Sequence, residues 1–403
     1  MSSNVEKIRR QFPALQGSPA PIYLDNACLT LKPQCVLDAI EEYYLEYPGC
    51  HGRSDHRFGR TATRKYERAR ARIARLVNAS NDFCVLFTRN TTESINLVAN
   101  GLDWRPDDEV VTSGIEHNSN LLPWQRLAKE GGIRHVVAPV NADTSFSMEG
   151  FADALSDRTR LVSMVHTSNL SGVTFPIEDI AKSARRHGAL LLIDAAQSVI
   201  SQDIDLKRLD VDFVAFSMHK AFGPTGTGVL CARRQVLEQI RPSFIGGETV
   251  SDTRYDSADF VDAPDRWEAG LQNYAGACGA GAAADFLASL RKSDIRRRLT
   301  SLNQVATEAV LSLPGVRLIG PEDPTLRAGI LNVVIDGINP HEVAMLLDQS
   351  ASVMVRAGYN CVHSWYHAAE TPESLRASFA IYNTLGDVEI FTQSLAKIVK
   401  HFR

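Results

Sequence analysis

Short apolar runs rich in β-branched residues alternate with amphipathic stretches along the first two thirds of this chain, and this alternation limits the folds available to it. Strands are predicted at Cys84–Thr88, Glu109–Thr112, His135–Ala138, Arg160–Val165, Leu190–Ile193, Phe213–Phe216 and Gly228–Ala232. Helical stretches such as Thr92–Ala99, Leu121–Lys129 and Ile177–His187 lie between them. Strands joined through helices form a mainly parallel sheet, so the pattern predicts an α/β domain.

The pattern changes near Asp294, where elements of mixed type follow one long helix. Beyond the helix Ile295–Ser312 and a helix after Pro340, the predicted elements are strands at Val316–Ile319, Ile330–Ile335, Ser352–Val355 and Arg376–Ile381 and a last helix at Val388–His401. We therefore expect a large domain over 21–293 and a smaller α+β domain over 294–403. Residues 1–20 are expected to pack against the small domain. The segment Gly246–Ala269, rich in Asp, Ser and Thr, is expected to be mobile.

Composition and charge exclude several classes of protein. The 403 residues carry a net charge of -4, which favours neither a nucleic-acid surface nor an acidic tail. Met1 to Gln11 is polar, and no apolar run reaches the roughly 18 residues of a membrane span. The seven cysteines form no CxxC pair and suggest no zinc site. We expect a reduced, cytoplasmic protein without a membrane segment or a metal.

Lys220 and Asp194 predict the cofactor. Lys220 follows Phe216-Ser217-Met218-His219 and precedes a glycine-rich run, whereas Asp194 ends the apolar run Leu190–Ile193. A lysine amine forms a Schiff base with the aldehyde of pyridoxal 5'-phosphate (PLP). A buried carboxylate keeps the pyridine nitrogen protonated, so that the ring accepts electrons from the substrate. This pair indicates a PLP site.

Other polar residues follow predicted strands, whose carboxyl ends form the ligand-binding edge of such a sheet. Thr91 and Thr92 open a helix and suit a phosphate, which Ser217 and His219 could also reach. His117 could stack on the ring or move a proton, while Asn169 and Gln197 could contact the ring hydroxyl. Taken alone, each residue also fits a common structural role, such as a helix cap, a turn residue or a solvated side chain. Their joint appearance in this order favours the cofactor.

Nearly end to end, the chain resembles fold-type I PLP enzymes of aminotransferase class V, and among them the SUF-type, or group II, cysteine desulfurases and selenocysteine lyases. The motifs that carry the resemblance are Tyr23-Leu24-Asp25-Asn26-Ala27, His56-Arg57, Thr91-Thr92-Glu93, Glu116-His117, Pro123-Trp124, Ser168-Asn169, Asp194, Gln197, Ser217-x-His219-Lys220, Gly246-Gly247 and Glu268-Ala269-Gly270. The resemblance implies a large domain with a mainly parallel seven-stranded sheet flanked by helices, plus a smaller α+β C-terminal domain. The stretch from Gly246 to Gly270 has the length of the extended hairpin insertion of group II.

The resemblance also implies roles for the cofactor residues. Lys220 is the Schiff-base lysine, Asp194 the pyridinium partner, and Gln197 a partner of the ring oxygen. His117 stacks on the ring, and Thr92, Ser217 and His219 hold the phosphate. Family members are homodimers, and the partner often adds a threonine to the phosphate. Here that position is Leu271, which has no hydroxyl. A phosphate contact from the partner would have to come from a backbone N–H or from Gln272, so it is left unassigned.

Two C-terminal blocks resemble the substrate end of the family site. By resemblance Arg376 grips the substrate carboxylate, Arg356 lies beside the substrate, and Asn26 and His56 belong to the same site. Cys361 stands at the position of the sulfur-accepting nucleophile. These roles imply conversion of L-cysteine to L-alanine with a persulfide on Cys361.

The sulfur would supply iron–sulfur cluster or other thio-cofactor assembly. The segment between Cys361 and Arg376 is too short for a long mobile loop, which implies a docking acceptor protein. The bulky run Val362–His367 departs from the family pattern and keeps alternatives open. These are another class V reaction, namely a C–S β-lyase, a selenocysteine lyase or an epimerase, and a catalytically silent scaffold.

Overall fold

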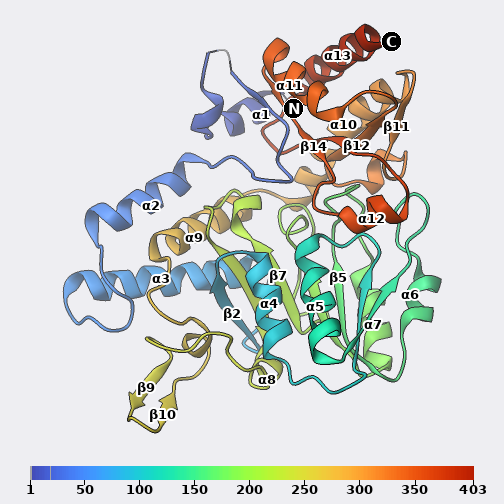
Figure 1. The fold of residues 1–403 in the computed structure, drawn as a ribbon. Coiled ribbons are helices and arrows are strands. Elements are labelled where there is room, and N and C mark those ends of the chain that lie inside the picture. Colours follow the sequence, from blue (N-terminus) through green and yellow to red (C-terminus); the bar gives the residue numbers. More distant parts are fainter. Residues whose placement is uncertain (1, 19) are drawn as a thin grey trace.

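The structure, a computed structural model, describes residues 2–18 and 20–403 and contains two domains with a cavity between them (Figure 1). The large domain is built on a seven-stranded sheet of order β2-β8-β7-β6-β5-β3-β4. Its strands are β2 (Phe83–Thr88), β3 (Glu109–Ser113), β4 (Arg134–Ala138), β5 (Thr159–Val165), β6 (Leu190–Asp194), β7 (Phe213–Ser217) and β8 (Gly228–Arg233). Only β8 runs antiparallel to its neighbours, so the predicted mainly parallel sheet is confirmed.

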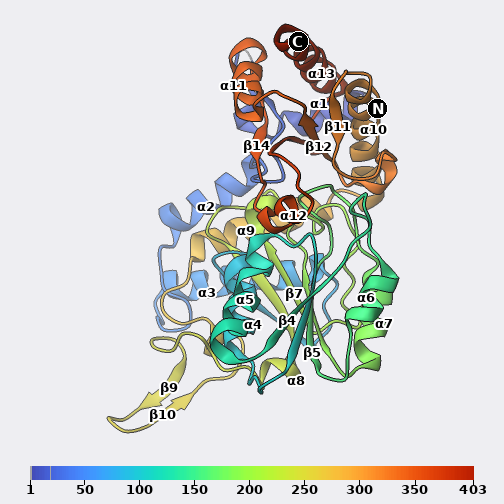
Figure 2. The ribbon, with the colours of Figure 1, turned by 45° about the vertical axis from the view of Figure 1, so that its right-hand side comes forward.

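Both faces of this sheet are covered, as the sequence predicted (Figure 2). Successive side chains of β6 enter different cores: Leu191 and Ile193 belong to one apolar cluster, and Leu192 belongs to the other. This is the two-residue alternation of an extended strand that is buried on both sides. The helices of the large domain are α3 (Arg57–Leu76), α4 (Thr91–Gly101), α5 (Leu122–Gly131), α6 (Met148–Ala154), α7 (Ile177–Arg186), α8 (Arg234–Leu237) and α9 (Tyr274–Ala288).

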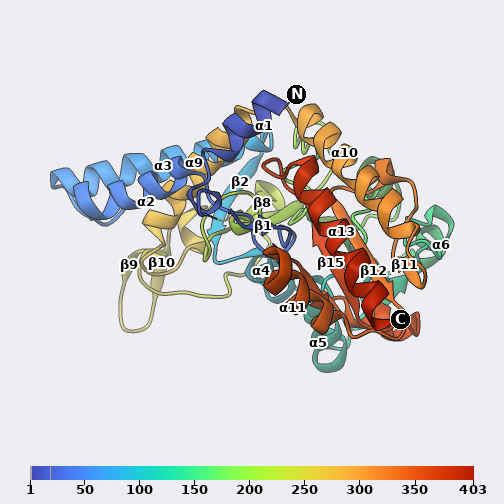
Figure 3. The same ribbon diagram turned by 90° about the horizontal axis from the view of Figure 1, so that it is seen from above.

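Helices α2 (Gln34–Glu46) and α3 extend sideways from the sheet as an arm, most clearly in the view from above (Figure 3). Helix α9 packs against both of them, and glycines permit the close approach. A Cβ atom at Gly281 would lie 2.9 Å from the Cα of Ala69 in α3. Below the arm, β9 (Val250–Thr253) and β10 (Ala258–Phe260) form an exposed hairpin within the segment expected to be mobile. The hairpin predicted from the family pattern is therefore present.

The small domain carries a four-stranded antiparallel sheet of order β11-β12-β15-β14. Its strands are β11 (Val316–Leu318), β12 (Ile330–Ile335), β14 (Arg356–Gly358) and β15 (Ser374–Ser378), and its helices are α10 (Lys292–Leu311), α11 (Pro340–Ala351), α12 (His363–Ala368) and α13 (Leu385–Phe402). Strand β15 begins and ends earlier than the predicted 376–381. Its end is set by Asn383, whose Oδ1 accepts from the backbone N of Ala380 at 2.8 Å and folds the chain into a turn.

The N-terminal residues lie against the small domain. Helix α1 (Ser2–Arg9) is joined to α13 by an ion pair of 2.9 Å between Arg9 Nη1 and Asp387 Oδ2. Strand β1 (Ile22–Tyr23) pairs in parallel with β13 (Val353–Met354). After β1 the chain crosses toward the large domain, which places residues 24–32 between the two domains. None of the helices in the described part of the chain is long and apolar enough to cross a membrane.

Candidate active site

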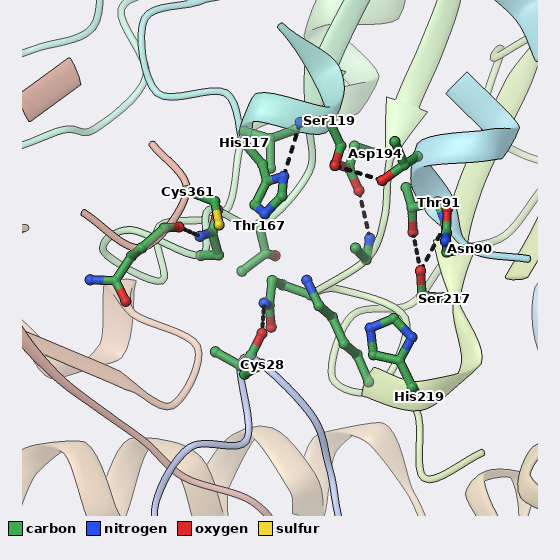
Figure 4. Close-up of a pocket in the computed structure, with 18 of the residues that line it drawn as sticks. Cys28, Asn90, Thr91, His117, Ser119, Thr167, Asp194, Ser217, His219 and Cys361 are labelled. Atoms are coloured by element: carbon green, nitrogen blue, oxygen red, sulfur yellow. Dashed lines mark hydrogen bonds between the residues drawn. The ribbon is translucent and has the colours of Figure 1, made fainter. Parts of the chain in front are cut away.

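A cavity of about 240 Å³ lies between the domains, at the carboxyl ends of β5, β6 and β7 (Figure 4). The cavity brings together the residues predicted to bind the phosphate and the ring of the cofactor, to form the Schiff base and to bind the substrate. Twelve of the predicted site residues line it, namely Thr91, Thr92, His117, Asn169, Asp194, Gln197, Ser217, His219, Lys220, Arg356, Cys361 and Arg376. The chain therefore brings together residues that are far apart in sequence, from the helix that begins at residue 91 to the last strand of the small domain.

Lys220 and Asp194 occupy the buried end of the cavity. Lys220 ends a short 3-10 turn (Met218–Lys220) directly after β7, and Asp194 ends the neighbouring strand β6. Burial lowers the pKa of Lys220, an effect that Asp194 opposes. Burial raises the pKa of Asp194, although its Oδ1 accepts from the backbone N of Ala196 at 2.9 Å. A lysine with a lowered pKa is a better nucleophile, and the second carboxylate oxygen is left for a ligand.

The N-terminus of α4 opens onto the cavity and suits an anion. Asn90 caps this helix by accepting from the backbone N of Glu93 at 3.0 Å. Ser217 Oγ accepts from the backbone N of Thr91 at 2.8 Å, which joins the helix to the end of β7. Gly228 permits this approach, because a Cβ atom there would lie 2.5 Å from the Cα of Asn90. Helix N-termini with free N–H groups bind phosphate, so this corner fits the phosphate of PLP.

His117 is held as a neutral ring at the cavity wall. Its Nδ1 accepts from the backbone N of Ser119 at 3.0 Å, so the neutral ring carries its proton on Nε2. Burial, with the nearby positive charge of Lys220, lowers the pKa of His117 to about 3. Of the two roles predicted for this residue, the geometry favours an apolar stacking face with an Nε2 donor over a general base.

Two amide side chains connect the large domain to the substrate side of the cavity. Gln197 Nε2 donates to the carbonyl of Ala27 at 2.7 Å. Asn169 Nδ2 donates to the carbonyl of Asn360 at 2.7 Å, and the Asn169 backbone carbonyl accepts from Arg376 Nη1 at 2.9 Å. These bonds fix the orientation of the two amides and of the arginine relative to the ring-binding end.

Arg376 and Arg356 face the substrate end from adjacent antiparallel strands, at paired positions of β15 and β14. Arg376 is buried, and its Nε has no hydrogen-bond partner among the described residues. Asp25 lies between the two guanidiniums, with Oδ1 3.5 Å from Arg376 Nη2 and Oδ2 3.8 Å from Arg356 Nη1. An unpaired N–H on a buried guanidinium is suited to the carboxylate of an amino-acid substrate.

Asp25 and Cys28 are site residues that were not predicted from the sequence. Cys28 lines the cavity, and Arg356 Nη1 donates to its Sγ at 3.0 Å. Asp25 lies within the first motif of the family resemblance, which was the available signal. Neither residue stands near Arg356 in sequence, so their grouping depends on the parallel pairing of β1 with β13.

Cys361 lies in the tight turn between β14 and α12. Asn360 and Cys361 have φ angles of 49° and 59°, in the left-handed region that non-glycine residues rarely occupy. The Cys361 carbonyl accepts from the backbone N of Asn118 at 2.8 Å, which holds the turn beside His117. Helix α12 is anchored by buried Tyr366, whose hydroxyl accepts from Asn332 Nδ2 at 3.2 Å. The bulky run after Cys361 thus forms a short helix that is anchored to strand β12 of the small domain.

Two predicted substrate residues are not brought to this cavity. Asn26 is buried, but its Nδ2 donates to the carbonyl of Ser378 at 2.6 Å, and its Oδ1 accepts from the Tyr382 hydroxyl. His56 caps the N-terminus of α3, where Nδ1 accepts from the backbone N of Gly59 at 3.3 Å. Asn26 therefore holds the chain beside β15, and His56 lies on the arm, outside the lining of its own chain's cavity.

The fold and the site together define a fold-type I PLP enzyme. The buried lysine fits the aldehyde, the buried aspartate fits the pyridine nitrogen, and the α4 N-terminus fits the phosphate. The unpaired Nε of Arg376 fits the carboxylate of an amino acid. When bound, PLP supplies an electron-withdrawing ring conjugated to the substrate amine.

The chain belongs to the aminotransferase class-V family, whose sequence pattern matches residues 22–391. Two curated relatives are named probable cysteine desulfurase. The protein from Vibrio cholerae is 35% identical over 406 residues and 99% of each chain, and that from Pseudomonas aeruginosa is 38% identical over 399 residues and 98% of each chain. Enzymes of this family depend on PLP, as the site indicates.

Solved structures agree with these relatives. An apo cysteine desulfurase from Thermococcus onnurineus is 35% identical and superposes with a TM-score of 0.94 over 98% of both chains. A cysteine desulfurase from Escherichia coli, in an S-sulfonic acid form, is 32% identical with a TM-score of 0.91 over 99% of both chains. The predicted fold class is confirmed at the level of the whole chain.

Proposed function

We propose that this chain is a PLP-dependent cysteine desulfurase that converts L-cysteine to L-alanine and keeps the sulfur as a persulfide on Cys361. One observation carries the proposal: the Cys361 thiol, the Lys220 amine and the buried guanidinium of Arg376, whose Nε has no partner among the described residues, line the same cavity. An amino acid held by Arg376 and joined to the cofactor near Lys220 has its side chain within that cavity. The naming of the relatives supports the same activity.

Each residue has a role that its environment supports. Arg376, with Arg356 beside it, binds the substrate carboxylate. Lys220, whose pKa is lowered by burial, would hold the cofactor aldehyde and would take the α-proton of the substrate. His117 covers the ring with a neutral imidazole. Among the phosphate residues, Ser217 is already hydrogen-bonded to the α4 N-terminus.

The sulfur transfer is a displacement at the substrate sulfur. The Cys361 thiolate forms an S–S bond to that atom while the bond between sulfur and the substrate β-carbon breaks. The electron pair of the broken bond remains with the β-carbon, which takes up a proton and becomes the methyl group of alanine. The sulfur of Cys361 is oxidised to the persulfide level and the β-carbon is reduced, so no further redox partner is needed.

A second copy of the chain is expected to complete the phosphate corner. A larger cavity of about 860 Å³ shares Asn90 and Thr92 with the active site and opens to the surface. Its rim includes Phe244 and Leu271, whose exposed fractions are 60% and 71%. Large apolar side chains exposed beside a polar site favour a covering protein surface. These observations support a homodimer in which Gln272 or a backbone N–H replaces the missing threonine.

A sulfur-acceptor protein is proposed as the second partner. Because α12 fills the segment after Cys361, no long loop can carry the persulfide outward, and the acceptor must approach the cavity mouth. The cytoplasm and the assembly of iron–sulfur clusters or other thio-cofactors are the proposed setting. They follow from the free cysteines and from the family resemblance.

The decisive experiment is incubation of the holoenzyme with L-cysteine and a reductant, comparing wild type, Cys361→Ala and Cys35→Ala. We expect alanine from wild type and from Cys35→Ala, since Cys35 is exposed and outside the cavity. We expect alanine formation by Cys361→Ala to fall at least about a hundredfold, while the visible absorbance of the bound cofactor is kept. Pyruvate and ammonia in place of alanine, or an active Cys361→Ala variant, would instead identify a C–S lyase.

A further inference from the structure

The carbonyl oxygen of His219, directly before the Schiff-base lysine, accepts hydrogen bonds from three donors of one segment. The backbone N of Thr30 donates to it at 3.0 Å, Thr30 Oγ1 at 3.1 Å and Lys32 Nζ at 3.1 Å. The Thr30 hydroxyl in turn accepts from the backbone N of Phe222 at 2.8 Å. The peptide before Lys220 and the backbone N of Phe222, two residues after it, are thus held by residues 30–32, although that segment lies some 190 positions away in sequence.

Phe222 makes this support necessary. Its φ angle is 62°, a left-handed conformation that is unfavourable for a bulky residue. Such a residue persists when its surroundings fix the backbone around it. Its ring is fully buried and packs edge-on against Phe12 at 5.8 Å between centroids, while its backbone N bonds to Thr30. The turn that carries Lys220 is therefore held partly by residues outside its own sequence.

Lys32 is unusual because it places a charged side chain in a partly buried position to hold a backbone carbonyl. It is partly buried, and within the described part of the chain its ammonium bonds only to the carbonyls of Thr30 and His219, with no carboxylate partner. Burial lowers the pKa of Lys32 to about 8, which leaves it mostly charged at neutral pH. A desolvated cation is costly unless an anion lies near. Burial and the positive charges of Lys220 and Lys32 lower the pKa of His219, whose ring lines the phosphate corner.

The same segment also reaches the small domain. The backbone N of Leu31 donates to the Tyr382 hydroxyl at 3.1 Å, and the backbone N of Ala27 donates to Ser378 Oγ at 2.8 Å. Ser378 lies two residues after Arg376 on β15. Residues 24–32 therefore connect the Schiff-base turn of one domain to the carboxylate-binding strand of the other.

We propose that Lys32 is a positioning residue for Lys220 and the phosphate corner. Together with Thr30 it fixes the peptide between residues 219 and 220, and it provides a positive charge behind His219 that favours the bound phosphate. This inference deepens the proposed function, but it depends only on the binding of PLP and not on the identity of the amino-acid substrate.

The test compares Lys32→Met, Lys32→Arg and Thr30→Val with wild type, and cofactor binding is measured before turnover. PLP titrated into the cofactor-free protein should show a Kd about tenfold higher for Lys32→Met, with Lys32→Arg within about threefold of wild type. Thr30→Val should keep the affinity but shift the visible absorbance band of the bound cofactor, because the lysine is less well aimed. With L-cysteine, kcat should fall and KM should be unchanged in both Lys32→Met and Thr30→Val.

Several results would overturn this inference. One is a Lys32→Met protein with the PLP affinity and absorbance of wild type. Equal weakening in Lys32→Arg would show that side-chain shape matters and the charge does not. A raised KM with an unchanged kcat would place Lys32 at the substrate end. If Lys32→Met does not fold, an unshifted absorbance band and normal kcat in Thr30→Val would still reject the positioning role. If wild type shows no desulfurase activity, the proposed function fails, but the comparison of PLP affinities still tests the role of Lys32.

Discussion

At the scale of single residues, the substrate end depends on a guanidinium that is buried before any substrate arrives. Arg376 has an exposed fraction of 2% and is balanced by Asp25 at 3.5 Å. Its unpaired Nε is a cost that a substrate carboxylate removes. In the proposed role of Arg376, the energy of that bond is available only to ligands with a carboxylate, so the residue selects for substrates that carry one.

Replacing Arg376 by lysine is therefore expected to weaken substrate binding. Lysine keeps the positive charge but loses the planar two-pronged contact, so kcat/KM for L-cysteine should fall about a hundredfold, mainly through KM. Steady-state kinetics of the PLP-loaded variant measure this. The control is Arg317→Lys, because Arg317 forms an exposed ion pair with Asp336. This variant should have the kcat/KM of wild type. A variant with normal KM would contradict the assignment of Arg376.

Glu116, next to His117, gives a prediction on pH and stability. Burial raises the pKa of Glu116 to about 7 from its ordinary value of 4.5. Between these values the folded protein binds more protons than the unfolded chain, so this residue's contribution to stability is lost as pH rises from 4.5 through 7. The free energy of unfolding of Glu116→Gln, taken relative to that of wild type, should therefore rise by roughly 3 kcal/mol as the pH is raised from 4.5 to 8. Urea unfolding at both pH values measures it.

The control for this experiment is Glu130→Gln, because Glu130 is exposed at the end of α5. Its difference from wild type should stay constant over the same pH range. A constant difference for Glu116→Gln as well would show that burial does not raise the pKa of Glu116 in the folded protein. The absolute stability of Glu116→Gln is not the readout, because the carboxylate also accepts from Ser113, Asn120 and Val165.

At the scale of elements, the sequence predicted the strands of the large sheet to within about a residue. Their apolar runs are short, β-branched and bounded by polar turns, and both faces are buried. It did not predict α9 (Tyr274–Ala288), since that helix is rich in alanine and glycine and buried on nearly all sides. Such a helix has no polar stripe, so the amphipathic period that reveals other helices is absent.

Some residues of the candidate site could likewise be predicted from the sequence, and others could not. Residues at strand ends, such as Asp194 and Asn169, could be predicted because the carboxyl ends of neighbouring parallel strands meet. The turn around Cys361 and the position of Asp25 could not be predicted from local pattern. Both depend on long-range pairings, of the Cys361 carbonyl with Asn118 and of β1 with β13.

The close packing of α9 on α3 gives an element-scale prediction. In Gly281→Ala the added methyl group would lie 2.9 Å from Ala69, so the helices must separate, and we expect a loss of about 1–3 kcal/mol in the free energy of unfolding. Gly131→Ala, at the end of α5, is the matched control, because its Cβ would meet only Leu127 Cδ2 at 3.9 Å. Chemical denaturation compares them. Equal stability of the two variants would contradict the close approach.

At the scale of the whole molecule, one buried ionic network joins the arm, the sheet and the hairpin base. Glu268 accepts from Arg70 Nη1 of α3 at 2.7 Å, from the Tyr66 hydroxyl at 2.7 Å and from the backbone N of Phe87 in β2 at 2.6 Å. Glu268 and Arg70 are both buried. Buried charges of this kind stabilise only when they are fully paired.

Removing one charge of this network should be costly. Glu268→Gln leaves the Arg70 guanidinium short of a buried counter-charge, and we expect a loss of about 3 kcal/mol or more and a lower thermal midpoint. Glu67→Gln is the control, since Glu67 also pairs with Arg70 but its side chain is 47% exposed, so its loss should cost under about 1 kcal/mol. Thermal unfolding of both variants distinguishes them. Similar midpoints would mean that Glu67 alone balances Arg70.

The crossing of residues 24–32 between the domains has a consequence for the order of events during synthesis. This segment leaves the ribosome before the residues that hold it, namely His219 and, later still, Ser378 and Tyr382. The strand of the large sheet that precedes Lys220 can form while the small domain is still unmade, but Arg376 cannot be set beside Asp25 until β15 follows. Lys220 and Arg376 therefore come to line one cavity only after β15 has been translated.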